Sequence, residues 1–204
     1  MCLIYYKPKG LTLRDTFTCE DWGTATAIHG DGIGIYYPSD YETIKHTPTP
    51  LGVASTRLWA SLQGVREELC IHFRAATHGT IHDSNTHPFT CKDTGLILMH
   101  NGVIPWLGSK KNSDTAELFE ILKQLSDPSL MLSRLAHIGN KFLIHKPNKA
   151  VRMFGEFIPK NGAYFSNDWH MCDLKAFNWD DKDFYGVDLP YKWREQPKKI
   201  KQVK

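Results

Sequence analysis

The sequence has no apolar run that approaches the ~20 residues of a membrane-spanning helix. It also lacks the charged, apolar and small-residue stretches with which a signal peptide begins. The glycine-rich phosphate loop G-x-x-x-x-G-K-[ST] is absent as well. These absences predict a cytoplasmic protein that contacts no membrane and has no such nucleotide site. A hydrophobic content of 41% is enough for the core of one globular unit.

Cysteine is scarce and the net charge is small. The five cysteines, an odd number without close pairs, indicate free thiols in a reducing compartment. A formal charge of +3 makes nucleic-acid binding an unfavoured function. Much of this charge lies near the end of the chain, at Lys192, Arg194, Lys198, Lys199, Lys201 and Lys204. We interpret these residues as a solvated tail, with contact to a partner or a nucleic acid as the alternative.

Hydrophobic periodicity predicts a mixed α/β domain without repeats. The expected strands are 2–6, 23–28, 32–37, 69–76, 95–100, 141–145, 150–154 and 163–166. The expected helices are 55–65, a helix that begins after Ser113, and 128–137. Residues 29–32 are predicted to be a hairpin turn, because their glycines permit positive φ. We expect a loop over 38–50, and a buried stripe on the second helix at Leu118, Phe119, Leu122 and Leu125.

Cys2 directly follows Met1 and precedes the apolar run Leu3-Ile4-Tyr5-Tyr6. Aminopeptidases remove an initiator methionine when the second residue is small, as cysteine is. The product would carry a thiol of pKa about 8.5 beside an α-amine of pKa about 7.7–8.0, which are a nucleophile and a base in one residue. The apolar run predicts a buried strand that anchors this end of the chain.

Four further motifs follow in order. They are HFRAATHG at 72–79, NTHPF at 85–89, GLILMHNGVI at 95–104 and NSDTAE at 112–117. Together with Cys2, their order and spacing resemble the glutaminase domain of the class II glutamine amidotransferases, which are N-terminal-nucleophile hydrolases. The resemblance covers about residues 2–168, and Ser166-Asn167 is similar to a pair found near the end of this domain. It implies an α+β fold, the four-layer αββα sandwich. The expected domain is 2–176, with an aromatic and basic extension over 177–204.

The resemblance also implies a role for each motif residue. Cys2 would be the nucleophile, and Asn101 and Gly102 would stabilise the oxyanion. Arg74 would bind the α-carboxylate of glutamine and Asp114, which we expect to be exposed, its α-ammonium group. Thr77, His78 and Gly79 would line the same pocket. Without the resemblance, Asn101-Gly102 would be a tight turn, Asp114 a helix-start acid and Arg74 a structural ion-pairing residue. Ala75 departs from the family, in which an aromatic residue is common at this position.

The expected function is therefore hydrolysis of L-glutamine to glutamate and ammonia through a Cys2 thioester, without a cofactor. Short domains of this type occur in bacteriophage and bacterial proteins, and the ammonia would pass to a separate synthase or acceptor. Two alternatives stay open: a non-catalytic binding module with this fold, and an amidohydrolase for another amide. Histidines 72, 78, 82, 87 and 100 lie close in sequence but lack the spacing of a zinc site, so no metal is expected. A papain-like Cys–His pair would not explain why the cysteine is the second residue.

Overall fold

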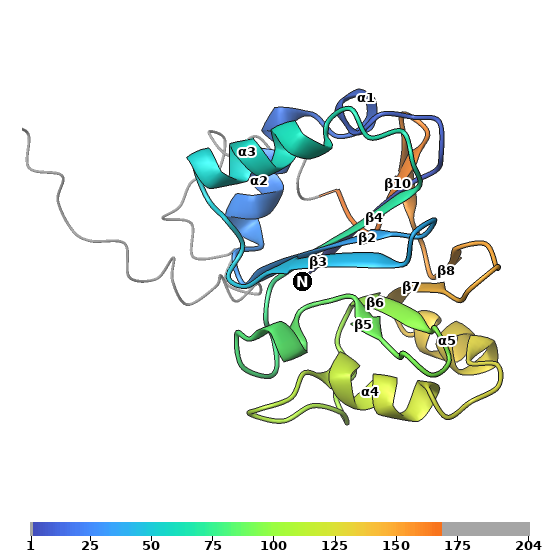
Figure 1. Cartoon of the computed structure of the whole chain (residues 1–204). Coiled ribbons are helices and arrows are strands. Elements are labelled where there is room, and N and C mark those ends of the chain that lie inside the picture. The colour runs from blue at the N-terminus through green and yellow to red at the C-terminus, as the bar shows by residue number, and fades with distance from the viewer. Residues whose placement is uncertain (1, 169–204) are drawn as a thin grey trace, which may run out of the picture.

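Two antiparallel sheets lie face to face between two layers of helices in the computed structural model, which describes residues 2–168 (Figure 1). The first sheet has the order β3-β2-β4-β1-β10-β9, and the second has the order β5-β6-β7-β8. This arrangement confirms the predicted α+β fold, the four-layer αββα sandwich. The predicted domain boundary at 176 and the extension 177–204 lie outside the described residues.

The strands of the first sheet are β1 (Leu3–Lys7), β2 (Gly32–Tyr37), β3 (Glu42–His46), β4 (Leu69–Arg74), β9 (Ile158–Lys160) and β10 (Ala163–Phe165). Those of the second are β5 (Phe89–Thr90), β6 (Ile97–Asn101), β7 (Lys141–His145) and β8 (Arg152–Phe154). The helices are α1 (Leu13–Thr16), α2 (Cys19–Ile28), α3 (Val53–Leu62), α4 (Asp114–Leu122) and α5 (Ser129–Ala136), with a 3₁₀ turn η1 at Asp83–Asn85. No helix within residues 2–168 has the length and apolar character needed to cross a bilayer.

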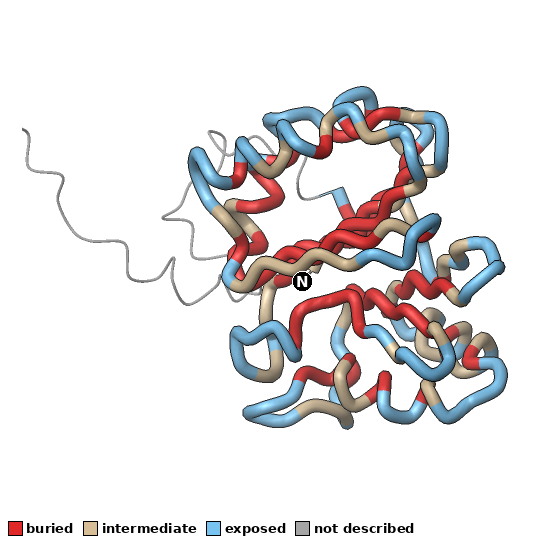
Figure 2. Tube along the Cα trace, in the orientation of Figure 1, coloured by how far each residue is buried: buried red, intermediate tan, exposed pale blue. Residues whose placement is uncertain are grey.

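Strand β1 occupies the middle of the first sheet, between β4 and β10. Ile4 lies opposite His72 of β4, and Tyr5 lies opposite both Ile71 of β4 and Phe165 of β10. Every backbone group of a central strand can pair with a neighbouring strand, so such a strand is held on both sides. The chain therefore begins in one of the most buried parts of the sheet (Figure 2).

Three apolar clusters hold the four layers together. The first lies between helices α1–α3 and the outer face of the first sheet, and it includes Leu13, Phe17, Trp22, Leu62, Tyr5, Ile71 and Phe73. The second lies between helices α4–α5 and the second sheet, and it includes Leu118, Phe119, Leu132, Leu98 and Phe142. The third joins the sheets through Ile4, Tyr36, Cys70, Ile97, Met99 and Leu143. Alternation along β4 places Ile71 and Phe73 in the first cluster and Cys70 in the third, as expected for a strand.

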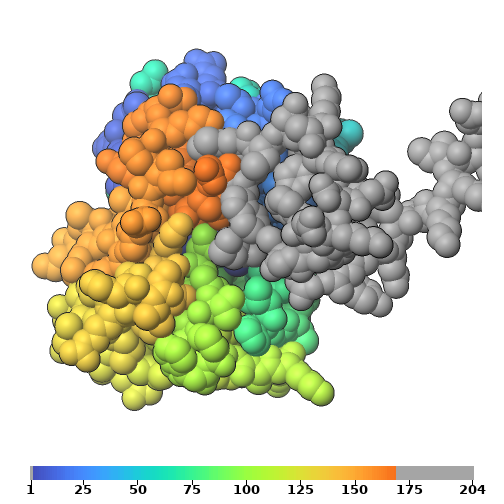
Figure 3. Space-filling model, turned by 180° about the vertical axis from the view of Figure 1, so that it is seen from behind, coloured from blue at the N-terminus to red at the C-terminus, as the bar shows by residue number. Residues whose placement is uncertain are grey.

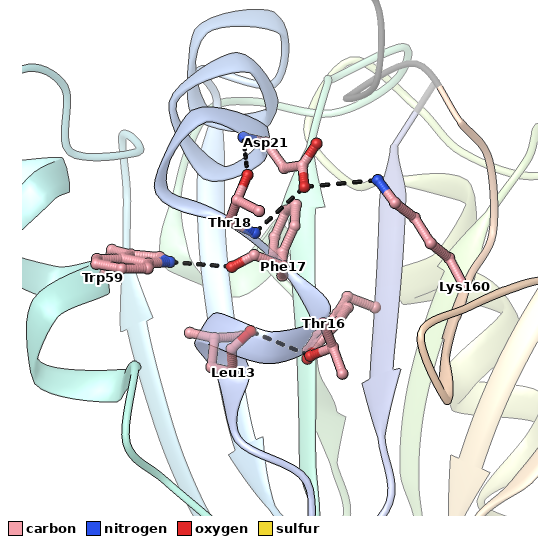
Figure 4. Close-up of polar contacts among 8 residues, drawn as sticks. Leu13, Thr16, Phe17, Thr18, Asp21, Trp59 and Lys160 are labelled. Carbon is pink, nitrogen blue, oxygen red and sulfur yellow. Dashed lines mark hydrogen bonds and ion pairs between the residues drawn. The ribbon is translucent and has the colours of Figure 1, made fainter.

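The predicted strand at 23–28 is wrong, because these residues belong to helix α2. The alternation of threonine with small residues resembles a strand, but a capping box begins the helix. Thr18 accepts a hydrogen bond from the backbone of Asp21, and the Asp21 carboxylate accepts one from the backbone of Thr18 (Figure 4). Trp22 then packs into the first cluster. The Asp21 carboxylate also lies 3.6 Å from Lys160 Nζ, which joins the helix to strand β9.

Two smaller expectations are also wrong. Residues 38–50 are not entirely loop, since β3 pairs with β2 along the edge of the first sheet. Its polar sequence, ETIKH, hides the strand because an edge strand is only partly buried. Leu125 is 36% exposed, because α4 ends at Leu122 and the helical stripe does not continue to it.

Lys7 is fully buried at the end of β1, and its ammonium group donates only to carbonyl oxygens. The acceptors are the carbonyls of Pro8, Leu11 and Glu67, at 3.3, 2.8 and 2.5 Å. A lysine that is buried in this way acts as a polar crosslink between β1 and the loops beside it.

Replacement of Lys7 by methionine should lower the free energy of unfolding by at least about 2 kcal/mol, because it leaves buried carbonyl groups without a donor. Urea unfolding followed by far-UV circular dichroism measures the change. Lys123→Met, on the surface of α4, is the matched control and should leave the urea midpoint unchanged. An unchanged midpoint for Lys7→Met would show that the hydrogen bonds from Lys7 to the three carbonyls do not contribute to stability.

Candidate active site

Cys2 lies immediately before β1 and is half-buried. Its thiol sulfur is 3.5 Å from the carbonyl oxygen of Ala75, which follows the neighbouring strand β4. The Asn167 side-chain amide donates to the backbone carbonyl of Cys2 at 2.6 Å. Burial raises the pKa of the Cys2 thiol, while the positive charge of Arg74 acts in the opposite direction. Strand β1 thus holds this thiol beside the end of β4 and the residues that follow β10.

Ser166, directly after β10, joins these elements. Its hydroxyl accepts a hydrogen bond from the Ile4 backbone at 2.8 Å and another from the Asn101 side-chain amide at 2.9 Å. Its own backbone N–H donates to the Ile4 carbonyl at 2.9 Å. Because Asn101 is the last residue of β6, this serine connects the start of β1 to the second sheet. Cys2 and Asn101, which are 99 positions apart in the sequence, are thereby brought to one site.

The Asn101 side chain is 3% exposed, and its Oδ1 has no hydrogen-bond partner among the described residues. A hydroxyl group can either donate or accept. Rotation of the Asn101 amide by half a turn would let Oδ1 accept the Ser166 hydroxyl proton, and would free Nδ2. The side chain can therefore donate an N–H hydrogen bond to a ligand and still keep a hydrogen bond to Ser166.

Gly102 has a φ of +151°, which L-residues with a side chain rarely adopt. A Cβ at this position would lie 2.2 Å from Asn140 Oδ1 and 2.9 Å from His100 Nε2. Glycine is therefore favoured here by its φ and by the contact of this position with Asn140 and His100.

His100 fixes the segment that carries Asn101 and Gly102. Its Nε2 is 2.8 Å from Asn140 Oδ1, and its Nδ1 is 2.8 Å from the hydroxyl of Thr115 at the start of α4. Since an amide oxygen can only accept, Nε2 carries the proton and Nδ1 accepts from the threonine. Burial lowers the pKa of His100, which favours this neutral form. The ring thus links the end of β6 to the start of α4 and to Asn140, the residue directly before β7.

Asp114 is buried, at 4% exposure, which corrects the expectation of an exposed acid. Its Oδ2 accepts from the Ile104 backbone at 2.8 Å, and its Oδ1 accepts from the Thr115 backbone at 2.7 Å. The carboxylate is buried because it accepts hydrogen bonds both from the chain after Gly102 and from the first turn of α4. In addition, Ser113 caps the helix through the backbone of Ala116 at 3.1 Å.

Arg74 ends β4 and is 2% exposed. Its guanidinium donates to the carbonyls of Thr80 and His78, at 3.2 and 3.1 Å. No carboxylate within residues 2–168 forms an ion pair with it. Burial lowers the pKa of Arg74, and the charges of Cys2, Asp31 and Asp114 raise it. A buried cation without a contacting anion favours the binding of an anionic ligand.

The other predicted pocket residues follow Arg74. Gly79 has a φ of +74°, and a Cβ there would lie 2.6 Å from the backbone nitrogen of Ser113. His78 is half-buried, and its Nδ1 has no partner in the described part of the chain. Thr77 is exposed, and no hydrogen bond of its side chain to another described residue is present. The structure therefore brings His78 and Gly79 to Arg74 and leaves Thr77 outside the hydrogen-bonded group.

Three contributing residues had not been predicted as part of the site. Asn85 accepts from the backbone of Ser113 at 2.8 Å and donates to the carbonyl of Lys111 at 2.8 Å. Asn140 contacts His100, and Asp31 contacts the chain after Arg74. Asn85 lies in the NTHPF segment, so the motif pointed to it, but nothing in the sequence marks Asn140.

His72 and His87 lie in contact between the sheets, with ring centres 3.9 Å apart and the rings tilted by 34°. His72 Nε2 donates to the carbonyl of His100 at 2.9 Å, while both ring nitrogens of His87 lack a partner among the described residues. Burial lowers the pKa of His72 to about 3 and places the pKa of His87 well below its usual value. The lowered pKa values keep both rings neutral near pH 7. Within residues 2–168, no group of three or more metal-binding side chains is present.

The family model of the class II glutamine amidotransferases matches residues 8–120. The probable glutamine amidotransferase DUG3 of Saccharomyces cerevisiae is 38% identical over 85 residues, which cover 38% of this chain and 23% of the yeast protein.

Two solved structures are similar as well, and each match covers 84% of this chain and 43% of the other. The allosteric regulatory enzyme of purine biosynthesis has a TM-score of 0.51 at 16% identity. The glutamine phosphoribosylpyrophosphate amidotransferase of B. subtilis has a TM-score of 0.44 at 15% identity. This chain spans less than half the length of these relatives.

Acidic pH should lower the free energy of unfolding, because His72 and His87 are buried in their neutral form. Their pKa values are lower in the folded state, so the unfolded chain takes up protons first as the pH falls. Stability is complete above pH ~6.5 and should fall below it, by up to about 1.4 kcal/mol per pH unit for each histidine. Urea unfolding between pH 7.5 and 5 measures this slope.

His87→Gln should reduce the slope by up to about 1.4 kcal/mol per pH unit, because glutamine does not titrate. Substitution of the exposed His137 by Gln is the control and should leave the slope unchanged. Stability independent of pH over this interval would contradict the burial of two neutral histidines.

Proposed function

We propose, because the chain belongs to the class II glutamine amidotransferases, that its site hydrolyses the side-chain amide of glutamine through a Cys2 thioester. Family membership supports hydrolysis of the glutamine amide in general. The four-layer fold, shared with the N-terminal-nucleophile amidotransferases, supports a nucleophile at the start of β1. Our proposal adds the identity of the nucleophile and the role of each neighbouring residue.

The observation that carries the proposal is that the adjacent residues Ser166 and Asn167 bind both Asn101 and the start of the chain's first strand, with Asn167 donating to the Cys2 carbonyl. Cys2 precedes β1, and Ser166 binds both Ile4 of that strand and Asn101 of the opposite sheet. An amide N–H of Asn101 and the backbone N–H of Gly102 are two donors of the kind that stabilise an oxyanion. The unpaired Asn101 Oδ1 supports this role, since the amide can turn without losing its bond to Ser166.

Recognition of glutamine is proposed to rest on two buried charges. The Arg74 guanidinium has no contacting anion within the described residues, so we assign it the α-carboxylate of the substrate. Asp114 is buried, and each of its oxygens has more than one lone pair, so it can accept from the α-ammonium group as well as from the backbone. His78 and Gly79 form the wall beside Arg74. Thr77, which is exposed, is proposed to contact the substrate at the rim.

The proposed reaction begins after removal of Met1. The Cys2 α-amine takes the thiol proton, and the sulfur forms a bond to the amide carbon of the glutamine side chain. Asn101 and Gly102 hold the negative oxygen of the tetrahedral intermediate. The carbon–nitrogen bond then breaks, and the nitrogen leaves as ammonia with the proton that the amine had taken. Water attacks the thioester, which releases glutamate and restores the thiol.

We also propose that the ammonia is consumed at an acceptor site outside residues 2–168. All of residues 2–168 belong to one sandwich, and no second folded unit is present among them. A domain of 2–176 with an extension over 177–204 stays a proposal from the sequence.

Cys2 should be the only thiol that the reaction needs. Cys2→Ala should abolish the release of ammonia from glutamine without lowering the melting temperature. Cys91→Ser, at a half-buried free cysteine, is the control and should retain activity. A coupled glutamate dehydrogenase assay measures both variants. Full activity of Cys2→Ala would refute the proposed nucleophile.

Two further substitutions should affect different kinetic constants. Arg74→Lys keeps the charge but loses the planar fork, so the KM for glutamine should rise by about 10- to 100-fold, which corresponds to ~1.5–3 kcal/mol. Asn101→Ala should instead lower kcat by about 10²- to 10³-fold, because an oxyanion donor acts mainly in the transition state. Steady-state kinetics separates these effects. A change in KM alone for Asn101→Ala would assign that residue to substrate binding.

A further inference from the structure

Asp31 is a buried carboxylate close to the site, and no step of the proposed reaction uses it. It lies in the turn between α2 and β2 and is 3% exposed. Its Oδ2 accepts a hydrogen bond from the Ala76 backbone at 2.8 Å, and its own backbone N–H donates to the Arg74 carbonyl at 3.1 Å. One residue therefore holds the chain on both sides of Ala75.

The carbonyl of Ala75 is the group that contacts the thiol of Cys2, at 3.5 Å. Because Asp31 fixes the Arg74 carbonyl and the Ala76 N–H, the two peptide planes that flank the Cα of Ala75 have little freedom to rotate. We propose that Asp31 is a positioning residue, which sets the resting position of the Cys2 thiol through the Ala75 carbonyl.

The turn that carries Asp31 is held by contacts of its own. Thr49 donates through its backbone to the Gly30 carbonyl at 3.1 Å, and through its hydroxyl to the His29 carbonyl at 2.8 Å. The strands that follow are paired as well, with Gly32 opposite Arg74. The turn therefore does not depend on the Asp31 carboxylate, and loss of that carboxylate should mainly release the chain at Ala76.

The carboxylate of Asp31 is required in this proposal as an acceptor and not as a charge. Asparagine keeps an oxygen at nearly the same position, so Asp31→Asn can still accept from the Ala76 N–H. Alanine has no acceptor and leaves that N–H unpaired. The contrast between the two variants separates a positioning hydrogen bond from an electrostatic effect on Arg74 or Cys2.

The experiment measures kcat for glutamine hydrolysis and the rate of alkylation of Cys2 by iodoacetamide, followed by peptide mass spectrometry. Asp31→Ala should lower kcat by about 10- to 100-fold, as expected when a reacting group is displaced. It should also change the alkylation rate several-fold. Asp31→Asn should restore both rates to within about threefold of the unmodified protein. Asp21→Ala removes a carboxylate that also accepts from a backbone N–H, but at the opposite end of α2 from Asp31, and should alter neither rate.

Equal rates for Asp31→Ala and the unmodified protein would overturn the proposal, as would an Asp31→Asn variant that is as defective as Asp31→Ala. If Asp31→Ala does not fold, Asp31→Ser takes its place, because its hydroxyl is too short to reach the Ala76 N–H. The inference rests on the proposed function, yet alkylation does not require turnover. Activity retained in Cys2→Ala would refute the proposed function, and the alkylation rates would still decide the role of Asp31.

Discussion

The hydroxyl of Ser166 is the contact on which the geometry of the site depends. It binds the backbone of Ile4 in the first sheet and the side chain of Asn101 in the second. Two sheets that pack through apolar side chains can slide, because apolar contacts have little directional preference. A directional hydrogen bond at the start of β1 fixes their relative position at the point where Cys2 lies. The same serine accepts from Lys141 Nζ through its carbonyl at 2.5 Å, so β7 is joined to this point too.

Around this contact the buried polar groups divide into two kinds. Both ring nitrogens of His100 and both oxygens of Asp114 have partners, so these residues hold the backbone in place. Asn101 Oδ1 has no partner among the described residues, and Arg74 has no contacting anion among them. Unpaired buried groups cost folding free energy, and such groups are common where a ligand binds. Asn101 and Arg74 are residues to which we assign the transition state and the substrate, whereas Asp114, which we assign to the α-ammonium group, already accepts from the backbone.

Short-range patterns in the sequence predicted much of this fold. The strands β1, β4, β6 and β7 and the helices α4 and α5 follow from apolar periodicity and from the cap at Ser113. Helix α2 was not predicted, because the alternation of threonine with small residues is typical of a strand. The capping box of Thr18 and Asp21 is the signal that marks the start of the helix. Ordered motifs placed Arg74, Asn101 and Asp114 in one site, but they did not show that Asp114 is buried. Asp31 and Asn140 could not be found, since their roles depend on contacts between residues 40 or more positions apart.

A trapped intermediate would show directly whether Cys2 forms a covalent bond with glutamine. Protein from its native host would be mixed with glutamine, quenched in acid within milliseconds to seconds, digested and analysed by mass spectrometry. We expect an N-terminal peptide that lacks Met1 and carries one glutamyl group on Cys2. A glutamyl group on another cysteine, or steady release of ammonia with no adduct on Cys2 at any quench time, would contradict it.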